Sequence, residues 1–304
     1  MGQQSSSFQT TATEDETMFR EDTLSQFAAI AFLSNSQALG DTAPQVLDNQ
    51  GVDALNAWLG KGGALIGLHA GCACLFQTPS FGVAMGSWFN YHPTISNVTF
   101  LKADPHVSTE MLPDRYTVFE ETYNFLTDPR DVDATVILTP DPESYSDPEF
   151  ATRGRYQGSP HPSAWYRDST VNLGNGTDAS TGTMTGRLWF TSLGHTIETW
   201  QSETHLAHVR AGIEWALQGT NNQMLQTSTP GSASRTASMS FSRSASASSS
   251  SSRDNSRSSL SSTQSPSSNS AGAPVQTDRP STAASNAIVT LTIVLSAVLV
   301  AILL

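Results

Sequence analysis

The sequence contains little cysteine and little positive charge. Among its 304 residues are 2 cysteines, 15 lysines and arginines together, and 27 acidic residues, for a formal net charge of -12. Cys72 and Cys74 are separated by one residue, so a disulfide between them would be strained, and we expect both to pack as small buried side chains. The sequence has no basic run, which disfavours nucleic-acid binding.

Large apolar residues are almost absent from residues 218–286, which consist mainly of Ser, Thr, Ala and Pro. Such a composition cannot bury enough surface to offset the entropy of ordering the chain. We predict a disordered stalk here, either O-glycosylated or a plain linker. Residues 1–217 instead alternate apolar runs with turn signals, and they are long enough for one well-buried α/β domain.

The C-terminal residues 287–304 are apolar apart from Thr290, Thr292 and Ser296. This run is about long enough to span a bilayer. Small residues at 269–272, a polar spacer and the apolar tail together match a signal for a GPI anchor. An ordinary transmembrane helix is the alternative, and both interpretations predict attachment at the cell surface or membrane through the C-terminus.

The most informative segment is the pentapeptide Gly67-Leu68-His69-Ala70-Gly71, which follows the apolar residues 64–66. A buried strand that breaks into G-x-[polar]-x-G before a helix has the form of a nucleophile elbow. Such a turn presents one side chain at the carboxyl end of a parallel sheet. Histidine at this position cannot form an acyl-enzyme as serine or cysteine does, but it suits a general base, a hydrogen-bond partner or a metal ligand.

Three further histidines, His92, His161 and His195, lie beside Pro or Gly at the edges of apolar runs. Functional side chains concentrate at such loop positions. We therefore predict that these three and His69 line one pocket at the carboxyl ends of the strands. His205 and His208 lie in a helical pattern, and we expect them at the surface or in a groove.

The order of apolar runs predicts alternating strands and helices. A strand, a helix and a second strand form a βαβ unit, and the glycines after the helix end it. The predicted strands are 27–33, 64–68, 135–138 and 187–190, the predicted helices are 52–59 and 206–217, and 168–186 is a loop insertion.

Five short motifs in this order resemble the ThuA-like (trehalose-utilisation) family: Gly67-Leu68-His69-Ala70, Tyr91-His92-Pro93, Glu121 to Phe125, His161 to Trp165, and Ser192-Leu193-Gly194-His195. The resemblance implies an α/β fold like that of class I glutamine amidotransferases, with a doubly wound, largely parallel sheet flanked by helices. It also implies a link to sugar metabolism. His69 stands where those amidotransferases carry their cysteine, so the residue at this position disfavours glutaminase chemistry.

The N-terminus departs from the family pattern. The family usually opens with a strand and a helix before the segment that matches residues 8–15, whereas Met1 to Ser7 carry neither of these nor an apolar signal-peptide region. We expect a fungal-type, surface-anchored member whose first strand is missing, which would leave an uncovered strand edge beside Phe8. Asn97 and Asn175 head N-glycosylation triplets.

The resemblance points to Glu121 as the acidic residue of the site, with His69 and His195 as acid/base groups. Tyr123 and Asn124 suit the recognition of polyols, with His92 and His161 beside them, and Trp165 is a candidate for stacking on a sugar ring. Glu198 is a candidate for orienting His195, or else an acid favoured at a helix start. A divalent metal held by His69, His92 and either His161 or His195 is a further option, although no H-x-x-x-H spacing supports it.

Two functions of different classes follow. One is a carbohydrate-active enzyme that works on a sugar or sugar derivative through His and Glu acid–base or metal-assisted chemistry, without a thiol nucleophile. The other is a non-catalytic carbohydrate-binding module at the cell surface.

Overall fold

A nine-stranded sheet forms the centre of the computed structural model, which describes residues 8–37, 45–154, 156–174, 182–220 and 298–303. All of these residues belong to one compact unit. In spatial order the strands are β1 (Gln9–Thr13), β13 (Val298–Leu303), β2 (Ala29–Leu33), β3 (Ala64–Leu68), β12 (Leu188–Thr191), β9 (Ala164–Arg167), β8 (Thr135–Pro140), β5 (Ser96–Lys102) and β6 (Arg115–Glu120).

Most strands of this sheet point in the same direction. β2, β3 and β12 pair in parallel. On both sides of these three strands, each further strand pairs antiparallel with its neighbour. β1, β2, β3, β12, β8 and β6 therefore run one way, while β13, β9 and β5 run the other way. The carboxyl ends of β3, β12 and β6 consequently lie along one edge of the sheet, as the predicted α/β fold requires.

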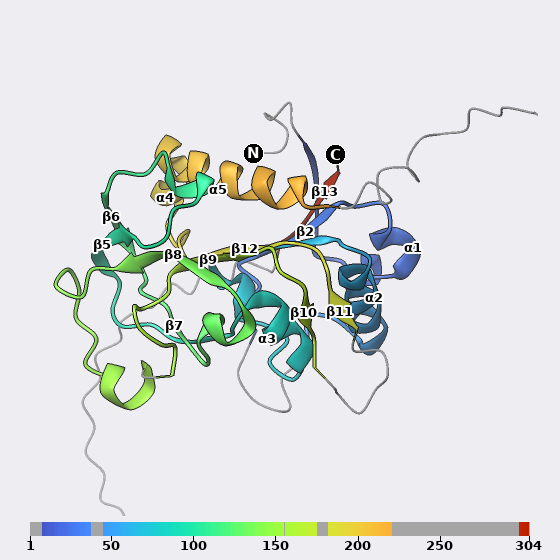
Figure 1. Cartoon of the computed structure of the whole chain (residues 1–304), viewed down its shortest axis with the longest axis horizontal. Coiled ribbons are helices and arrows are strands. Elements are labelled where there is room, and N and C mark those ends of the chain that lie inside the picture. Colours follow the sequence, from blue (N-terminus) through green and yellow to red (C-terminus); the bar gives the residue numbers. More distant parts are fainter. Residues whose placement is uncertain (1–7, 38–44, 155, 175–181, 221–297, 304) are drawn as a thin grey trace, which may run out of the picture. The chain divides into compact units, whose positions relative to one another are not determined.

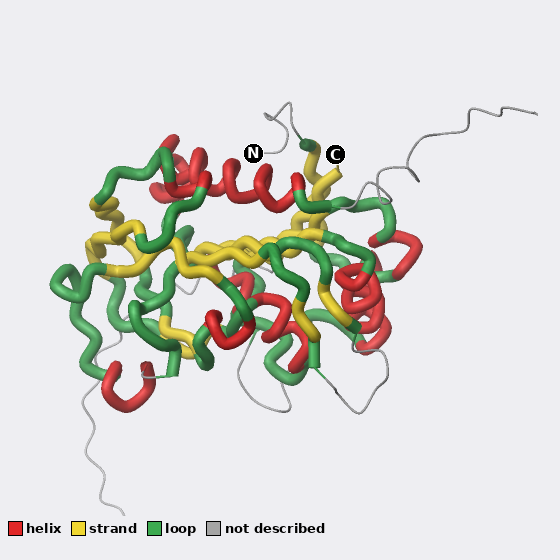
Figure 2. Tube along the Cα trace, viewed as in Figure 1, coloured by secondary structure: helices red, strands yellow, loops and turns green. Residues whose placement is uncertain are grey.

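Helices cover both faces of the sheet (Figures 1 and 2). One face carries α2 (Asn49–Gly60) and α3 (Pro79–Met85), and the other carries α4 (Ile197–Gln201) and α5 (Glu203–Gln218). A short α1 (Glu21–Leu24) packs against α2. Two small antiparallel sheets complete the fold: β4 (Phe89–Tyr91) with β7 (Asn124–Phe125), and β10 (Val171–Asn172) with β11 (Thr183–Met184).

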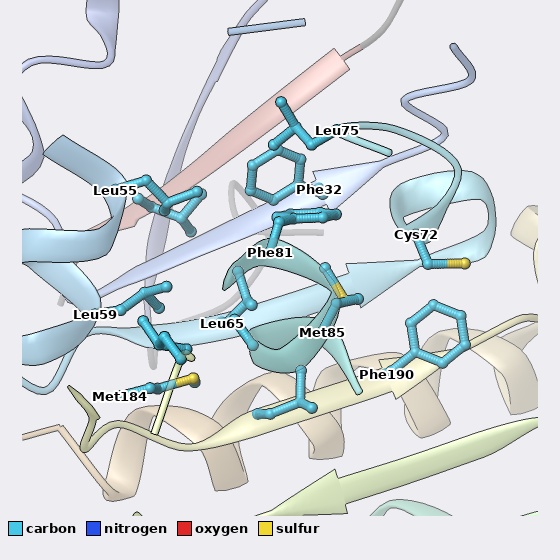
Figure 3. Packing of buried hydrophobic residues seen from close by; sticks show 14 of the residues in the cluster. Phe32, Leu55, Leu59, Leu65, Cys72, Leu75, Phe81, Met85, Met184 and Phe190 are labelled. Carbon is cyan, nitrogen blue, oxygen red and sulfur yellow. The ribbon is translucent and has the colours of Figure 1, made fainter. Parts of the chain in front are cut away.

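The two long helices begin at side-chain caps and bury one face each. Asp48 accepts a hydrogen bond from the Gly51 amide at the start of α2, and Ser202 caps α5. Such caps satisfy amides that have no partner within the helix. Leu55 and Trp58 of α2 enter the core on one side of the sheet, shown in part in Figure 3.

The predicted strand at 64–68 is confirmed to the residue, and the predicted helices form within longer ones. The expected loop insertion at 168–186 contains the short pair β10 and β11, with residues 175–181 outside the described residues.

Histidines 205 and 208 are buried, so their expected surface or groove location is wrong. His205 lies four residues before Val209 and eight before Ile213, on the stripe that α5 packs against the sheet. His208 donates from Nδ1 to the Ser108 carbonyl and accepts from the Thr191 hydroxyl.

At the C-terminus, β13 lies between β1 and β2 and pairs with both. β13 thus pairs with one edge of β1, and β1 is the outermost strand of the sheet. The predicted stalk is 218–286, but Gln218 is the last residue of α5. Residues 221–286 of the stalk, residues 287–297 and 304 of the predicted anchor, and Asn175 lie outside the described residues. None of the helices that the structure describes is long and apolar enough to cross a membrane.

Candidate functional site

His69 lies directly after β3 in a tight turn. Its φ of 51° is in the left-handed region, which histidine adopts more readily than most residues. The flanking glycines are required by close packing, because a Cβ at Gly67 would meet Met85 and Phe190, and one at Gly71 would overlap the Phe32 carbonyl. The elbow form is thus confirmed, and the His69 side chain at the turn is buried.

The register of the central strands brings His69 to Ser192. Leu68 of β3 pairs in parallel with Thr191 of β12, so the next residues of both strands emerge side by side. His69 Nδ1 donates a hydrogen bond to the Ser192 carbonyl oxygen at 2.9 Å. Because a carbonyl only accepts, Nδ1 carries the hydrogen of the neutral ring, and Nε2 presents a lone pair.

Glu121 follows β6 and contacts three imidazoles. Its Oε2 lies 3.1 Å from His195 Nδ1 and 3.6 Å from His69 Nε2, and its Oε1 lies 3.2 Å from His92 Nε2. These four residues, with Tyr123, are called the Glu121 cluster below. The expected convergence of His69, His92 and His195 is therefore confirmed.

Tyr123 completes the buried side of the Glu121 cluster. Its hydroxyl lies 3.0 Å from His69 Nε2 and donates to that lone pair. Burial and the nearby Glu121 carboxylate hold the Tyr123 pKa well above its ordinary value, so the phenol keeps its hydrogen. Phe89 packs on the Tyr123 ring, with centroids 4.6 Å apart.

The cluster has a buried half and an accessible half. Side-chain exposure is 8% for His69 and 11% for Glu121, but 36% for His92 and 39% for His195. Burial lowers the His69 pKa to about 4, with the neighbouring histidines lowering it further and the Ser192 hydrogen bond opposing them. A ligand from solvent would reach His92 and His195 first.

Glu120 positions the His195 loop, and the sequence interpretation missed it. Its carboxylate accepts from the backbone amides of Gly194, at 2.8 Å, and His195, at 3.1 Å. It also accepts from the Glu121 amide. Burial raises its pKa to about 7 against these three hydrogen bonds. The signal in the sequence was only the Glu120-Glu121 pair, with nothing to show that the first carboxylate turns inward.

His161 bonds to the backbone of Tyr123 and is not among the imidazoles that contact Glu121. Its Nε2 donates to the Tyr123 carbonyl oxygen at 2.7 Å, and its Nδ1 accepts from the Tyr145 hydroxyl at 3.1 Å. It lines a hollow of about 510 Å³ together with Tyr145, Asp147 and Phe150. His161 is therefore separate from the three histidines around Glu121, contrary to the expectation of one shared pocket.

Two residues expected to bind sugar are buried and make their hydrogen bonds within the protein. Trp165 is fully buried, donates to the Met85 carbonyl and stacks on Phe190. Asn124 is also buried and bonds to Asp147 and Gln157. Both lie in strands, β9 and β7, whose packing uses up the polar atoms that a ligand would need.

Within the described part of the chain, the remaining residues singled out in the sequence make no ion pair with Glu121, although Cys72 Sγ lies 3.9 Å from the His69 carbonyl oxygen. Glu198 is exposed in the first turn of α4, and the carboxylate that contacts His195 is Glu121 instead. Asn97 is exposed on β5. Cys72 and Cys74 are buried, unpaired thiols, as expected, and Figure 3 shows Cys72 beside Phe190.

One set of three side chains has the composition of a metal site. Ligand atoms of His69, Glu121 and His195 all lie within 4.8 Å of one another. Two imidazoles and a carboxylate form a ligand set found in zinc and non-haem iron proteins.

A sequence profile of the family described as "ThuA: Trehalose utilisation" matches residues 1–216. The solved structure of a ThuA-like protein from Bacteroides uniformis has a similar fold, with a TM-score of 0.51 and 18% identity over 69% of this chain and 77% of that chain. A ThuA-like protein from Parabacteroides merdae matches with a TM-score of 0.41 and 17% identity over 60% of this chain and 69% of that chain. None of the curated protein sequences matches significantly.

Proposed function

The chain belongs to the ThuA (trehalose utilisation) family, and from this membership we propose that it acts on a sugar or sugar derivative at the Glu121 cluster. The observation that carries the proposal is the contact of one buried carboxylate with three imidazoles, two of which reach solvent. Neutral or charged, these groups donate and accept hydrogen bonds in the way that neighbouring sugar hydroxyls require.

The pairing of imidazoles with the Glu121 carboxylate supports acid–base chemistry. His195 and His92 contact opposite oxygens of Glu121, so a proton taken up on one ring is compensated by the carboxylate between them. His69 is held by Ser192 and Tyr123 behind them. In this proposal His69 and His195 exchange protons with the sugar, and Glu121 orients them.

A thiol nucleophile is not part of the proposal. Cys72 and Cys74 are fully buried, and burial raises the pKa of the Cys72 thiol far above its ordinary value. Because the thiolate is the reactive form, neither residue suits the role that cysteine has in glutamine amidotransferases.

The test compares Glu121→Gln with Glu198→Gln in the full chain, against a panel of mono- and disaccharides followed by ligand-observed NMR and product analysis. Both substitutions exchange a carboxylate for an amide of the same shape. Loss of turnover or binding in Glu121→Gln alone would support the proposal. An equal response of both variants, or no interaction of the unchanged protein with any sugar, would contradict it.

A non-catalytic binding module is the second candidate, and the hollow beside His161 favours it. Tyr145 and Phe150 supply aromatic faces there, and His161 supplies a polar ring. Aromatic walls with a few polar groups suit sugar recognition. Phe150→Ala would weaken sugar binding under this alternative while Glu121→Gln would leave it unchanged, the reverse of the result expected for the enzyme.

Membrane attachment through residues 287–304 is a separate proposal that rests on composition. Residues 298–303 have their backbone paired in the sheet as β13, so they cannot lie in a bilayer at the same time. Attachment therefore requires β13 to leave the sheet. Release of the protein from membranes by a phosphatidylinositol-specific phospholipase would support a GPI anchor, and retention of Leu304 in soluble protein would contradict attachment.

A further inference from the structure

We infer that the Glu121 cluster binds one divalent transition-metal ion through His69 Nε2, Glu121 Oε2 and a ring nitrogen of His195. The inference deepens the proposed function by adding a cofactor to the same cluster. Only the statement that the ion acts on a sugar rests on that function. The ion would polarise a hydroxyl or carbonyl oxygen of the sugar.

The spacing of the ligand atoms suits a small coordination sphere. Ligands about 2.1 Å from a tetrahedral zinc ion lie about 3.4 Å from one another. Glu121 Oε2 is 3.1 Å from His195 Nδ1 and 3.6 Å from His69 Nε2, and all three ligand atoms lie within 4.8 Å of one another. Three protein ligands leave a position for the substrate, as in catalytic metal sites.

The surroundings of each ligand are those of a preorganised site. A metal-binding imidazole usually donates its other nitrogen to a carbonyl or carboxylate, and His69 Nδ1 donates to the Ser192 carbonyl. The backbone of His195 is held by Glu120. His69 Nε2 is therefore directed at Glu121 by contacts outside the three ligands.

The surroundings of the Glu121 carboxylate also favour a bound cation. This carboxylate is buried, and within the described part of the chain its neighbours at ion-pair distance are imidazoles, with no lysine or arginine among them. A buried charge is costly unless it is paired or coordinates a metal. A divalent ion supplies the missing positive charge.

The Tyr123 hydroxyl competes with an ion for the His69 lone pair, from which it lies 3.0 Å away. The Glu121 carboxylate is a second acceptor for the same hydroxyl, so the phenol hydrogen turns to it when Nε2 binds an ion. An ion bound by His69 and His195 takes the place of their proton exchange with the sugar. His92 contacts Oε1, the carboxylate oxygen that the ion does not take, and it then carries the proton transfer.

The experiment titrates the chelator-treated full chain with Zn²⁺, Co²⁺ or Mn²⁺ alone, using calorimetry and the visible spectrum of bound Co²⁺. We expect one ion per chain. His69→Gln, Glu121→Gln and His195→Gln should each weaken binding by at least about 100-fold, the upper end of the loss known for an outer-shell partner. Glu198→Gln is the matched control for Glu121→Gln, an exposed carboxylate replaced in the first turn of α4, and should bind as the unchanged protein does.

Absence of binding, or binding that survives all three ligand substitutions, would overturn the inference. His195→Gln keeps the test valid if His69→Gln fails to fold, because the His195 side chain is 39% exposed. Sugar turnover by a protein that binds no ion would overturn the metal site and leave the proposed function standing. Metal binding without any sugar interaction would leave the metal site standing and overturn the proposed function.

Discussion

The hydroxyl of Tyr123 lies 3.0 Å from Nε2 of His69, while the other nitrogen of that imidazole donates to the Ser192 carbonyl. Both ring nitrogens of a nearly buried histidine are therefore satisfied, and the ring cannot turn without losing two hydrogen bonds. Residues 69, 123 and 192 come from three distant parts of the sequence, so this one imidazole links the elbow to two other loops.

Tyr123→Phe should destabilise the protein modestly. The substitution removes the donor to His69 Nε2 and leaves that nitrogen buried without its partner, which costs about 1–3 kcal/mol. Urea denaturation of both proteins measures the difference. A loss within experimental error would show that the hydroxyl does not donate to His69 in solution.

Gly71→Ala should destabilise the protein by about 3 kcal/mol or more, the upper end of the cost of overpacking. A Cβ at this position overlaps the Phe32 backbone carbonyl, which cannot move aside as a side chain does. Gly60→Ala at the end of α2 is the control, since its nearest contact would be the Thr183 carbonyl oxygen at 3.4 Å. That variant should remain within about 1 kcal/mol of the unchanged protein, as judged by the same urea titration.

Both thiols should resist modification in the native protein. Cys72 and Cys74 are fully buried, and burial raises the pKa of each above its ordinary value. A chromogenic disulfide reagent should therefore release no colour at pH 8 until denaturant is added, when both cysteines of the chain react. Rapid reaction without denaturant would contradict the buried placement.

Stability should fall as the pH drops from about 6.5 towards 4. Burial lowers the pKa of His208 to about 4 and that of His205 to about 3, so both are neutral in the folded protein, whereas they protonate near 6.5 when unfolded. Their contribution is fully present above 6.5 and is lost as the pH falls. For His208 alone the shift corresponds to about 3 kcal/mol. Urea midpoints between pH 7 and pH 4 provide the measurement.

His205→Phe offers a matched control for this pH dependence. Neither ring nitrogen of His205 has a hydrogen-bond partner among the described residues, while the ring packs against Trp200 and lies near His208. Replacing an unpaired buried polar ring by an apolar one should not destabilise the protein at pH 7, and it should flatten the acid limb of the stability curve. An unchanged acid limb would show that His205 does not contribute to it.

Local pattern was enough to predict much of the framework. The run from Ala64 to Leu68 is apolar at every position, as a strand covered on both faces must be, and glycines mark its end at the elbow. These are properties of neighbours in the sequence, so they can be read without knowing what packs against them. The family motifs extended this prediction to Glu121 and to the histidines at positions 69, 92 and 195.

Tertiary contacts decided which polar residues remain available to a ligand. Trp165 and Asn124 lie in motif segments like Glu121, yet their polar atoms bond to Met85, Asp147 and Gln157. His161 bonds to the Tyr123 carbonyl and not to Glu121, and Glu120 turns inward to hold the His195 loop. A sequence specifies which donors and acceptors exist, but which of them meet depends on strand order and register. Here the parallel pairing of Leu68 with Thr191 placed His69 beside Ser192 and within reach of His195.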